Sequence, residues 1–340
     1  MLRTIKQGGL AAARFAGLFR VASASSYRNS RVFVIGYHSV SLDDEHEWDP
    51  SLYISPKTLR RRLEAIRLNN CTVLSLDDAI SRVNEGNLPE RAVVLTFDDG
   101  TSDFHGIVWP MLQEFGYPAT VYLTTYYCEN RYPVTPGIWS YLLWKARRNN
   151  KVNLQPIVGE DARFDLARSS DRAAAVKKII DFARSRNQDA QQRDVLSAEL
   201  ASLLGVDYQQ IRKQRLLELM TPDEVRQVSN EGASVQMHMH RHATPPERER
   251  YLNNLEENRR FISNLTVAPP THFCYPCGVY NQESVSWLRA LGVASATTCE
   301  PGFMSTNTDK LVIPRLIDSS TISELAFESW IVGIGALMTV

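Results

Sequence analysis

The sequence has no long hydrophobic run, no internal repeat and few cysteines, and each of these absences narrows the class of protein. A membrane-spanning helix needs ~20 apolar residues, whereas the apolar stretch at residues 330–340 has only 11. We therefore expect this stretch to form a last helix of the core rather than an anchor. The five cysteines are an odd number and are widely spaced, which argues against a disulfide framework and favours a reducing, cytoplasmic compartment.

The chain also lacks an excess of charge of either sign, because 38 basic residues balance 38 acidic ones. It contains no basic run with interleaved aromatic residues, so we expect no nucleic-acid partner. Acidic residues are absent from residues 1–42, although this region holds six arginines and lysines. The one marked asymmetry of charge therefore lies at the N-terminus.

Residues 1–30 are predicted to form a basic amphipathic segment. Arg14 and Arg20 interrupt any apolar stretch of the kind found in a signal peptide, so we do not expect one. On an ideal helix the larger apolar residues share one arc: Ile5, Phe15, Leu18 and Phe19. One interpretation is peripheral contact of residues 1–28 with anionic lipid at the inner membrane. The other, which we favour, is a helix docked on the domain with its cations facing water.

Short apolar runs alternate with helical patterns along most of the chain, which predicts parallel strands and an α/β fold. The expected strands are residues 32–37, 72–74, 92–97, 119–123, 234–237, 271–275, 293–297 and 311–314. Ser55-Pro56 and Thr221-Pro222 are typical of helix starts.

About eight such strand–helix units predict a distorted (β/α) barrel of seven or eight parallel strands, spanning residues 31–330 and followed by an apolar tail at 331–340. Residues at about 145–220 break the alternation and read as helices, so we expect a helical insertion there; an independent small domain fits its length as well.

Two adjacent carboxylates, Asp98 and Asp99, directly follow the expected strand at 92–97, and Gly100 comes next. Like charges at close range resist joint ionisation, and a bound cation removes that cost. An ordinary Asp-Gly turn is the alternative. Because chemistry in a barrel gathers at the carboxyl ends of the strands, we expect both carboxylates at the mouth.

The run at 238–242 contains three histidines, His238, His240 and His242, at the end of another expected strand. One carboxylate and two imidazoles that leave a coordination position open are the outline of a catalytic metal site. From the residues alone, the pairs His238/His240 and His240/His242 are alternatives to the pair His238/His242.

Together these motifs resemble the polysaccharide deacetylase family, carbohydrate esterase family four. Residues 96–100 resemble its first motif, residues 238–242 its second and residues 273–278 its third. The resemblance covers about residues 32–145 and 215–318, and it implies removal of N-acetyl, or O-acetyl, groups from an oligo- or polysaccharide with release of acetate.

The resemblance also implies a role for each motif residue. Asp98 would be the general base, and Asp99, His238 and His242 would hold a divalent metal. The backbone N–H of Cys277 would face the oxyanion. Zn²⁺ is the expected ion, and Co²⁺, Mn²⁺, Ni²⁺ and Fe²⁺ are compatible with the same ligands.

Two departures from the family pattern bear on activity. The best-known members carry an arginine that steadies the base at the place where this chain has Cys274. Members also often end with a histidine that serves as general acid, yet no histidine follows His272, which leaves His38, His105 and Asp318 as candidates. Two alternative functions follow: a catalytically impaired glycan-binding barrel, and a deacetylase of a non-sugar amide.

Overall fold

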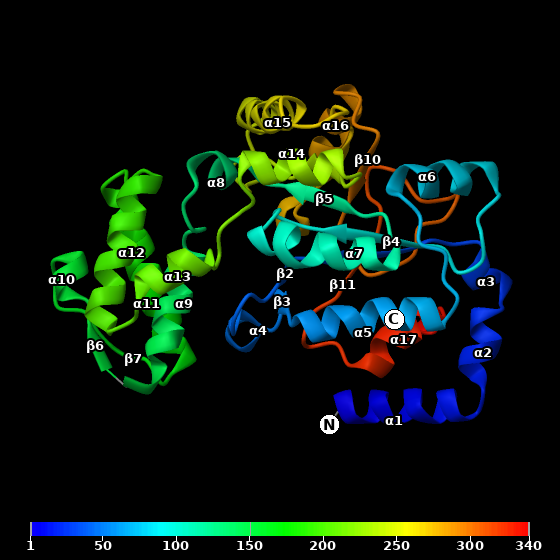
Figure 1. Ribbon diagram of the computed structural model, residues 1–340, viewed down its shortest axis with the longest axis horizontal. Helices are drawn as coiled ribbons and strands as arrows, with labels where there is room; N and C mark the ends of the chain where they lie inside the picture. Colours follow the sequence, from blue (N-terminus) through cyan, green and yellow to red (C-terminus); the bar gives the residue numbers. More distant parts are fainter. Residues whose placement is uncertain (1, 150, 339–340) are drawn as a thin grey trace.

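The computed structural model describes residues 2–149 and 151–338, and its centre is a strongly curved sheet of seven parallel strands (Figure 1). In sheet order the strands are β10 (Ser295–Thr297), β9 (His272–Cys274), β8 (Ser234–Met237), β5 (Thr120–Leu123), β4 (Val93–Phe97), β1 (Phe33–Tyr37) and β11 (Leu316–Ile317). A single parallel bridge between Thr297 and Ile313 joins the two edges. The sheet is an incomplete (β/α) barrel, which confirms the predicted fold class.

Two of the expected strands differ in the structure. At residues 72–74 only Val73 pairs, through one bridge to Val93, so the strand expected there is wrong. The strand expected at 311–314 lies slightly later, at Leu316–Ile317. Pro314 has no N–H to donate to a ladder, and the residue before it, Ile313, bonds to β10 instead.

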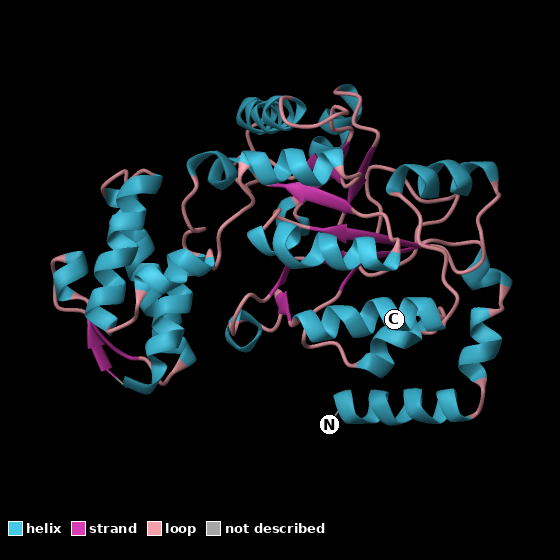
Figure 2. Ribbon diagram, in the orientation of Figure 1, coloured by secondary structure: helices cyan, strands magenta, loops and turns pink. Residues whose placement is uncertain are grey.

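Helices surround the curved sheet (Figure 2). They are α5 (Pro56–Leu68), α6 (Leu76–Glu85), α7 (Trp109–Phe115), α14 (Pro222–Asn230), α15 (Arg248–Ser263), α16 (Gln282–Ala290) and α17 (Glu324–Ile331). The predicted helix starts are confirmed, because the hydroxyls of Ser55 and Thr221 cap α5 and α14, each followed by a proline. Covered in this way, β1 and β4 are buried along their whole length.

Residues 137–217, here called the helical subdomain, bury a hydrophobic cluster of their own beside the barrel (Figure 1). The elements are α9 (Gly137–Lys145), β6 (Lys151–Asn153), α10 (Gln155–Val158), β7 (Arg163–Asp165), α11 (Ser169–Ser185), α12 (Ala190–Leu204) and α13 (Tyr208–Gln214). The antiparallel pair β6–β7 was not expected from the sequence. Trp139 lies at the centre of this cluster, where its indole N–H donates to Ser197.

The N-terminal segment forms α1 (Leu2–Phe15), α2 (Leu18–Ser23) and α3 (Ser26–Asn29). Gly17 has a left-handed backbone (φ 76°) and breaks the helix between α1 and α2, so the apolar arc expected from one ideal helix is not continuous. Phe19 is buried, whereas Phe15 is 97% exposed. Arg14 forms an ion pair with Glu328 of α17 at 3.1 Å, which docks α1 on the domain.

None of the helices in the described ranges is long and apolar enough to cross a membrane. At the other end of the chain, the apolar residues Phe327, Trp330 and Ile331 of α17 are buried. Met1 of the predicted N-terminal segment and residues 339–340 of the predicted tail lie outside the described residues.

Candidate metal centre and active site

The polar motifs follow three strands of the sheet, β4, β8 and β9. Asp98 and Asp99 come directly after β4, and His238 comes directly after β8. Cys277 lies in the turn Pro276–Gly278 that follows β9, with an exposed side chain and a left-handed backbone (φ 55°). Since parallel strands point the same way, all of these residues lie at the carboxyl edge of the barrel.

Asp99, His238 and His242 converge on one point. Oδ1 of Asp99 lies 3.3 Å from Nε2 of His238 and 3.2 Å from Nε2 of His242. The three ligand atoms lie within 4.8 Å of one another. Oδ1 of Asp99 is buried and accepts no hydrogen bond from the described residues.

The orientation of His238 explains why this point suits a cation. Its Nδ1 donates to the carbonyl oxygen of Cys274 at 2.8 Å, so in the neutral ring the lone pair of Nε2 faces Asp99. A lone pair and a carboxylate oxygen repel each other unless a proton or a cation lies between them. One carboxylate and two imidazole nitrogens, the first of them held by a carbonyl, form a donor set that fits a divalent metal.

The pKa directions of Asp99 and His242 are consistent with this fit. Burial acts to raise the pKa of Asp99, but His242 and His238 outweigh it and hold that pKa well below its ordinary value. Burial lowers the pKa of His242, which favours the neutral imidazole that metals bind. Burial also acts to lower the pKa of His238, but Cys274 and Asp99 raise it well above its ordinary value.

The backbone at this point is held in uncommon conformations. Asp99 (φ 68°), Met239 (φ 66°) and His242 (φ 47°) all lie in the left-handed region. Such conformations cost ~1–3 kcal/mol each and gather at functional sites. The turn at Met239 directs the next side chain away from the group, because Nδ1 of His240 bonds to Oγ1 of Thr125 at 2.9 Å. The structure therefore brings together the pair His238/His242 and not the pairs that include His240.

Asp98 is buried against a residue that the sequence analysis missed, Arg315. Nη1 and Nη2 of Arg315 each donate to one oxygen of Asp98 at 2.8 Å. The remaining N–H groups donate to Thr96, Thr298 and Cys274, so all five donors of the guanidinium are used. Burial acts to raise the pKa of Asp98, but the ion pair with Arg315 keeps it below its ordinary value.

A glycine makes room for this guanidinium. A Cβ atom at Gly36 of β1 would approach Cζ of Arg315 to 3.3 Å and Cδ1 of Ile317 to 2.6 Å. The sequence gives no local signal for this contact, because Gly36 and Arg315 are recognisable as neighbours only in the folded sheet. Arg315 therefore brings a guanidinium from another segment to the place where the family pattern expects an arginine at position 274. The thiol of Cys274 accepts a hydrogen bond from Arg315 at 3.0 Å.

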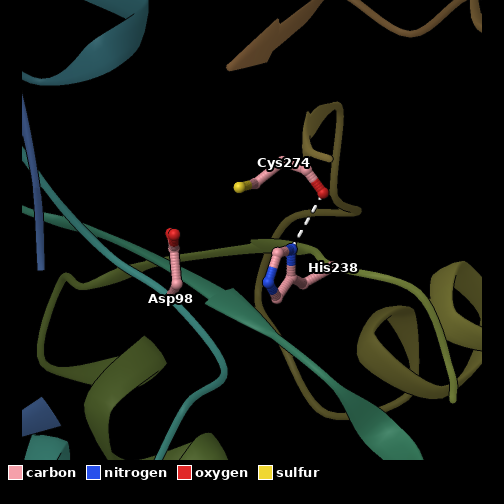
Figure 3. Close-up of side chains that lie close together, drawn as sticks. All are labelled: Asp98, His238 and Cys274. Carbon is pink, nitrogen blue, oxygen red and sulfur yellow. Dashed lines mark hydrogen bonds between the residues drawn. The ribbon is translucent and has the colours of Figure 1, made fainter. Parts of the chain in front are cut away.

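Asp98, His238 and Cys274 also lie close together, as Figure 3 shows. Their ligand atoms lie within 4.8 Å of one another, which is a spacing compatible with a metal. Arg315, however, donates to both oxygens of Asp98 and to the sulfur of Cys274. A guanidinium cation already neutralises this group, so it does not fit a second metal.

Two buried asparagines of α15 hold the loop that carries the histidines. Oδ1 of Asn258 accepts from the backbone N–H of His238 at 3.0 Å. Oδ1 of Asn254 accepts from the backbone N–H groups of His240 and Arg241 at 2.7 and 3.1 Å. The two asparagines are four residues apart on one face of α15, and this spacing was the missed signal in the sequence.

Of the three candidate proton donors, the structure places one at the site. His38, which follows β1, lines the same cavity as Asp99 and His242, and its buried Nδ1 has no partner among the described residues. His105 bonds to Gln227 of α14 at 3.0 Å. Asp318 forms a buried ion pair with Arg62 of α5 at 2.8 Å. Both of these side chains are engaged away from the metal-binding group.

A cavity of about 200 Å³ opens beside the metal-binding group. Short elements at the mouth form part of its wall: α4 (Glu45–Trp48), β3 (Tyr53–Ile54), which pairs with β2 (Ser39–Val40), and α8 (Thr125–Asn130). The two chain segments that connect the barrel to the helical subdomain complete it.

A family model described as polysaccharide deacetylase matches residues 85–158 and 185–296. The matched ranges include both aspartates, His238, His242 and Cys277, which makes this chain a member of the polysaccharide deacetylase family. His38 and Arg315 lie outside the matched ranges.

Among curated proteins, the poly-beta-1,6-N-acetyl-D-glucosamine N-deacetylase of Escherichia coli (strain K12) is 37% identical over 87 residues. That alignment covers 25% of this chain and only 12% of the relative. The chain therefore matches a small part of that protein.

Solved structures share the fold at low identity. The deacetylase PplD of Streptococcus pyogenes, in complex with acetate, has a TM-score of 0.56 at 14% identity, covering 86% of this chain and 94% of that one. IcaB of Ammonifex degensii has a TM-score of 0.54 at 13% identity, covering 91% and 99%. A polysaccharide deacetylase of Bacillus cereus has a TM-score of 0.54 at 17% identity, covering 89% of this chain and 69% of that one. These likenesses support the (β/α) barrel.

Proposed function

We propose that this chain is a metal-dependent hydrolase that removes N-acetyl groups, or O-acetyl groups, from a glycan and releases acetate. The observation that carries the proposal is the convergence of Asp99, His238 and His242 on one buried, unpartnered carboxylate oxygen. An ionised carboxylate that is not a ligand, Asp98, lies beside this group.

When bound, the metal polarises the acyl carbonyl and lowers the pKa of a water molecule. We assign the other steps to side chains and backbone of this chain. Asp98 accepts the proton of the attacking water, and Arg315 fixes the direction of its carboxylate through two hydrogen bonds. General base catalysis of this kind contributes ~10²–10⁴-fold. The backbone N–H of Cys277 faces the oxyanion, where a fixed donor has its largest effect in the transition state.

The amine that leaves must gain a proton, and we assign this step to His38. The support is its position in the cavity beside Asp99 and His242, together with its unpartnered Nδ1. With His38 as proton donor, the lack of a histidine after His272 no longer argues for an inactive, glycan-binding barrel. The second argument for an inactive barrel was the cysteine at position 274, where an arginine was expected. Arg315 answers it, because its guanidinium holds Asp98 in the same way.

The first polymer to test is poly-β-1,6-N-acetyl-D-glucosamine, because a relative named for that activity matches part of the chain. We propose Zn²⁺ as the first ion to test. A non-sugar N-acetyl amide belongs in the same panel, since the metal-binding group by itself does not select a sugar.

Replacement of Asp98 by asparagine tests the proposal. We expect Asp98→Asn to lower acetate release at least ~10²-fold, while bound zinc, measured by elemental analysis, stays at the wild-type level. Asp223→Asn is the matched control, because Asp223 is an exposed carboxylate of α14 with 81% of its side chain accessible. Unchanged turnover in Asp98→Asn would show that Asp98 is not the base.

Two substrates with different leaving groups distinguish proton donation by His38 from a purely structural role. His38→Ala should lose most of its activity on an N-acetyl amide, whose amine needs a proton. It should keep its activity on an aryl acetate, whose phenolate leaves without one. An equal loss on both substrates would instead indicate a role for His38 in holding the site together.

We also propose that the enzyme is cytoplasmic and touches the inner membrane through α1 and α2. All five cysteines are unpaired in the structure, which supports a reducing compartment. On the outer side of the docked helices, Phe15 is 97% exposed, Leu18 52% and Val21 69%, and Arg20 is exposed among them. Exposed apolar side chains next to cations suit an anionic lipid surface.

A further inference from the structure

The cavity beside the metal-binding group is larger than an acetyl group requires. A methyl group is about the size of a water molecule, whose share of the liquid is ~30 Å³. The cavity measures about 200 Å³. Several further carbon atoms fit beyond the methyl group of a bound acetyl.

Away from Asp99, His242 and His38, much of the cavity wall is apolar, and it is built from distant parts of the chain. Trp48 and Leu52 contribute from the mouth of the barrel. Val134 precedes the helical subdomain and Leu217 ends it, and the N–H of Val134 donates to the carbonyl oxygen of Leu217 at 2.8 Å. This hydrogen bond closes the wall where the chain leaves and re-enters the barrel.

Several polar atoms of the wall already have partners within the protein. The indole N–H of Trp48 donates to Ser140 at 3.3 Å, and the hydroxyl of Tyr127 bonds to Thr135 at 3.0 Å. Thr124 donates to the carbonyl oxygen of His238 at 3.2 Å. A sugar ring brings hydroxyl groups that would find few free partners here, whereas a hydrocarbon chain needs none.

We propose that this cavity binds the acyl group of the substrate and that it accepts linear acyl chains longer than acetyl. The inference rests on the proposed function, because the acyl carbonyl must lie at Asp99 and His242 for its chain to enter the cavity. Each methylene buried adds about fourfold to kcat/KM, according to the usual free energy of burying a CH₂ group. The preference rises with chain length until the cavity is full.

A chain-length series tests this inference. Chitotriose N-acylated with acetyl, propionyl, butyryl or hexanoyl groups is given to the zinc-loaded protein, and kcat/KM is measured from the free amine released. We expect kcat/KM to rise by about fourfold per methylene from acetyl to butyryl. Hydrolysis of the acetyl substrate without activity on the longer ones would overturn the inference and leave the proposed function standing.

Two variants fill the cavity from different sides. Val134→Phe acts from a loop, and Leu52→Trp acts from a residue that is 39% exposed and therefore tolerates a larger side chain. Each should lower kcat/KM for the hexanoyl substrate at least about tenfold more than for the acetyl substrate. Val267→Phe is the matched control, because Val267 is 78% exposed outside the cavity. Equal losses at every chain length would show that the cavity binds another part of the substrate.

Binding of the product acids gives a readout that does not depend on turnover. Hexanoate should bind the zinc-loaded protein more tightly than acetate in calorimetry, and Val134→Phe should remove the difference. This result in a protein without hydrolytic activity would reject the proposed function and retain the acyl cavity. Equal affinities for the two acids would reject the cavity alone.

Discussion

At the scale of single residues, the proposed role of Asp98 as general base depends on its ion pair with Arg315. Both side chains are almost completely buried, at 2% and 0% exposure. Breaking a buried pair by removing one partner costs ~3–5 kcal/mol, because the other charge stays buried without compensation. Arg315 therefore has two effects: it stabilises the fold, and it holds the Asp98 carboxylate ionised and in one orientation.

Moving the arginine tests its role in positioning. Arg315→Met should lower kcat/KM by ~10²-fold or more and also lower the free energy of unfolding. The double variant Arg315→Met/Cys274→Arg places a guanidinium on β9, next to the same carboxylate, and should recover part of both losses.

Activity and stability measured in both the single and the double variant distinguish a catalytic role of Arg315 from a structural one. A double variant that regains stability in urea unfolding but stays inactive would show that Arg315 serves the fold alone. Recovery of activity with a normal pH profile would show that the position of the charge matters, and not the strand from which it comes.

Asp103 gives a pH dependence of stability. Burial raises the pKa of this carboxyl to about 7, although Thr101 and the N–H of Val40 donate to it. Between its ordinary value of 3.8 and about 7, the unfolded chain loses this proton while the folded protein keeps it. The folded protein then binds more protons, so its stability falls as pH rises through this window.

Asp103→Asn has no ionisable group at this position, so its free energy of unfolding should not fall with pH for this reason. Each pH unit in the window changes the free energy of unfolding by ~1.4 kcal/mol, so the variant should gain up to ~4 kcal/mol over wild type between pH 4 and pH 7. Above pH 7 the difference should stay constant. Urea unfolding of both proteins at each pH measures it, and a difference that is the same at pH 4 and pH 7 would contradict the argument.

The contrast between Asp99 and Arg315 explains what could be predicted from the sequence. Asp98, Asp99 and the histidines lie in short motifs whose residue types and spacing are local, so the metal-binding group could be expected. Arg315 lies 217 positions from Asp98, and nothing near it marks a partner. Its role depends on the curvature of the sheet, which brings the segment before β11 beside β4.

At the scale of elements, hydrogen bonds from α15 fix the position of residues 238–242, the histidine loop that follows β8. Asn258 bonds at once to the N–H of His238, the carbonyl oxygen of Leu123 and the hydroxyl of Thr125. These contacts link β8, β5 and α8 through one amide. The left-handed residues in the loop cost conformational energy, and the two asparagines of α15 supply bonds that hold it in place.

Replacing this amide should loosen the metal site. Asn258→Leu keeps the volume but removes the partner of two buried backbone groups, the N–H of His238 and the carbonyl oxygen of Leu123, each at a cost of ~1–3 kcal/mol. Since such supporting contacts typically change metal affinity ~10–100-fold, we expect zinc binding to weaken by that factor in a competition assay with a chelator. Asn253→Leu on the exposed face of the same helix is the matched control, and equal zinc affinity in the two variants would contradict a role for Asn258.

The helical pattern of residues 145–220 was recognisable, yet the exact boundary was not. α9 begins at Gly137, before the stretch that looked unusual in sequence, and its side chains pack into the cluster of the helical subdomain. A helix that is apolar on nearly all sides gives no periodic signal about which core it will join.

At the scale of the whole molecule, the basic N-terminal segment lies along α17, on a part of the surface formed by helices (Figure 1). Deletion of residues 1–28 would be a poor test of lipid binding, because Arg28 is fully buried and donates to the carbonyl oxygens of Ile331 and Ala92. Substitutions on the outer side of α1 and α2 leave these contacts in place.

Phe15→Ser/Leu18→Ser should therefore reduce membrane contact without disturbing the fold. Burying the two wild-type side chains in the lipid interface is worth ~1.5–3 kcal/mol each, and each nearby cation adds ~1 kcal/mol on an anionic surface. We expect the wild-type protein to co-sediment with vesicles that contain phosphatidylglycerol, less so at high salt, and the double variant to lose at least ~10²-fold in partitioning. Leu68→Ser on α5, at a side chain that is 78% exposed, should behave as wild type. A wild-type protein that stays in the supernatant at every lipid concentration would show that α1 and α2 are only docked on the barrel.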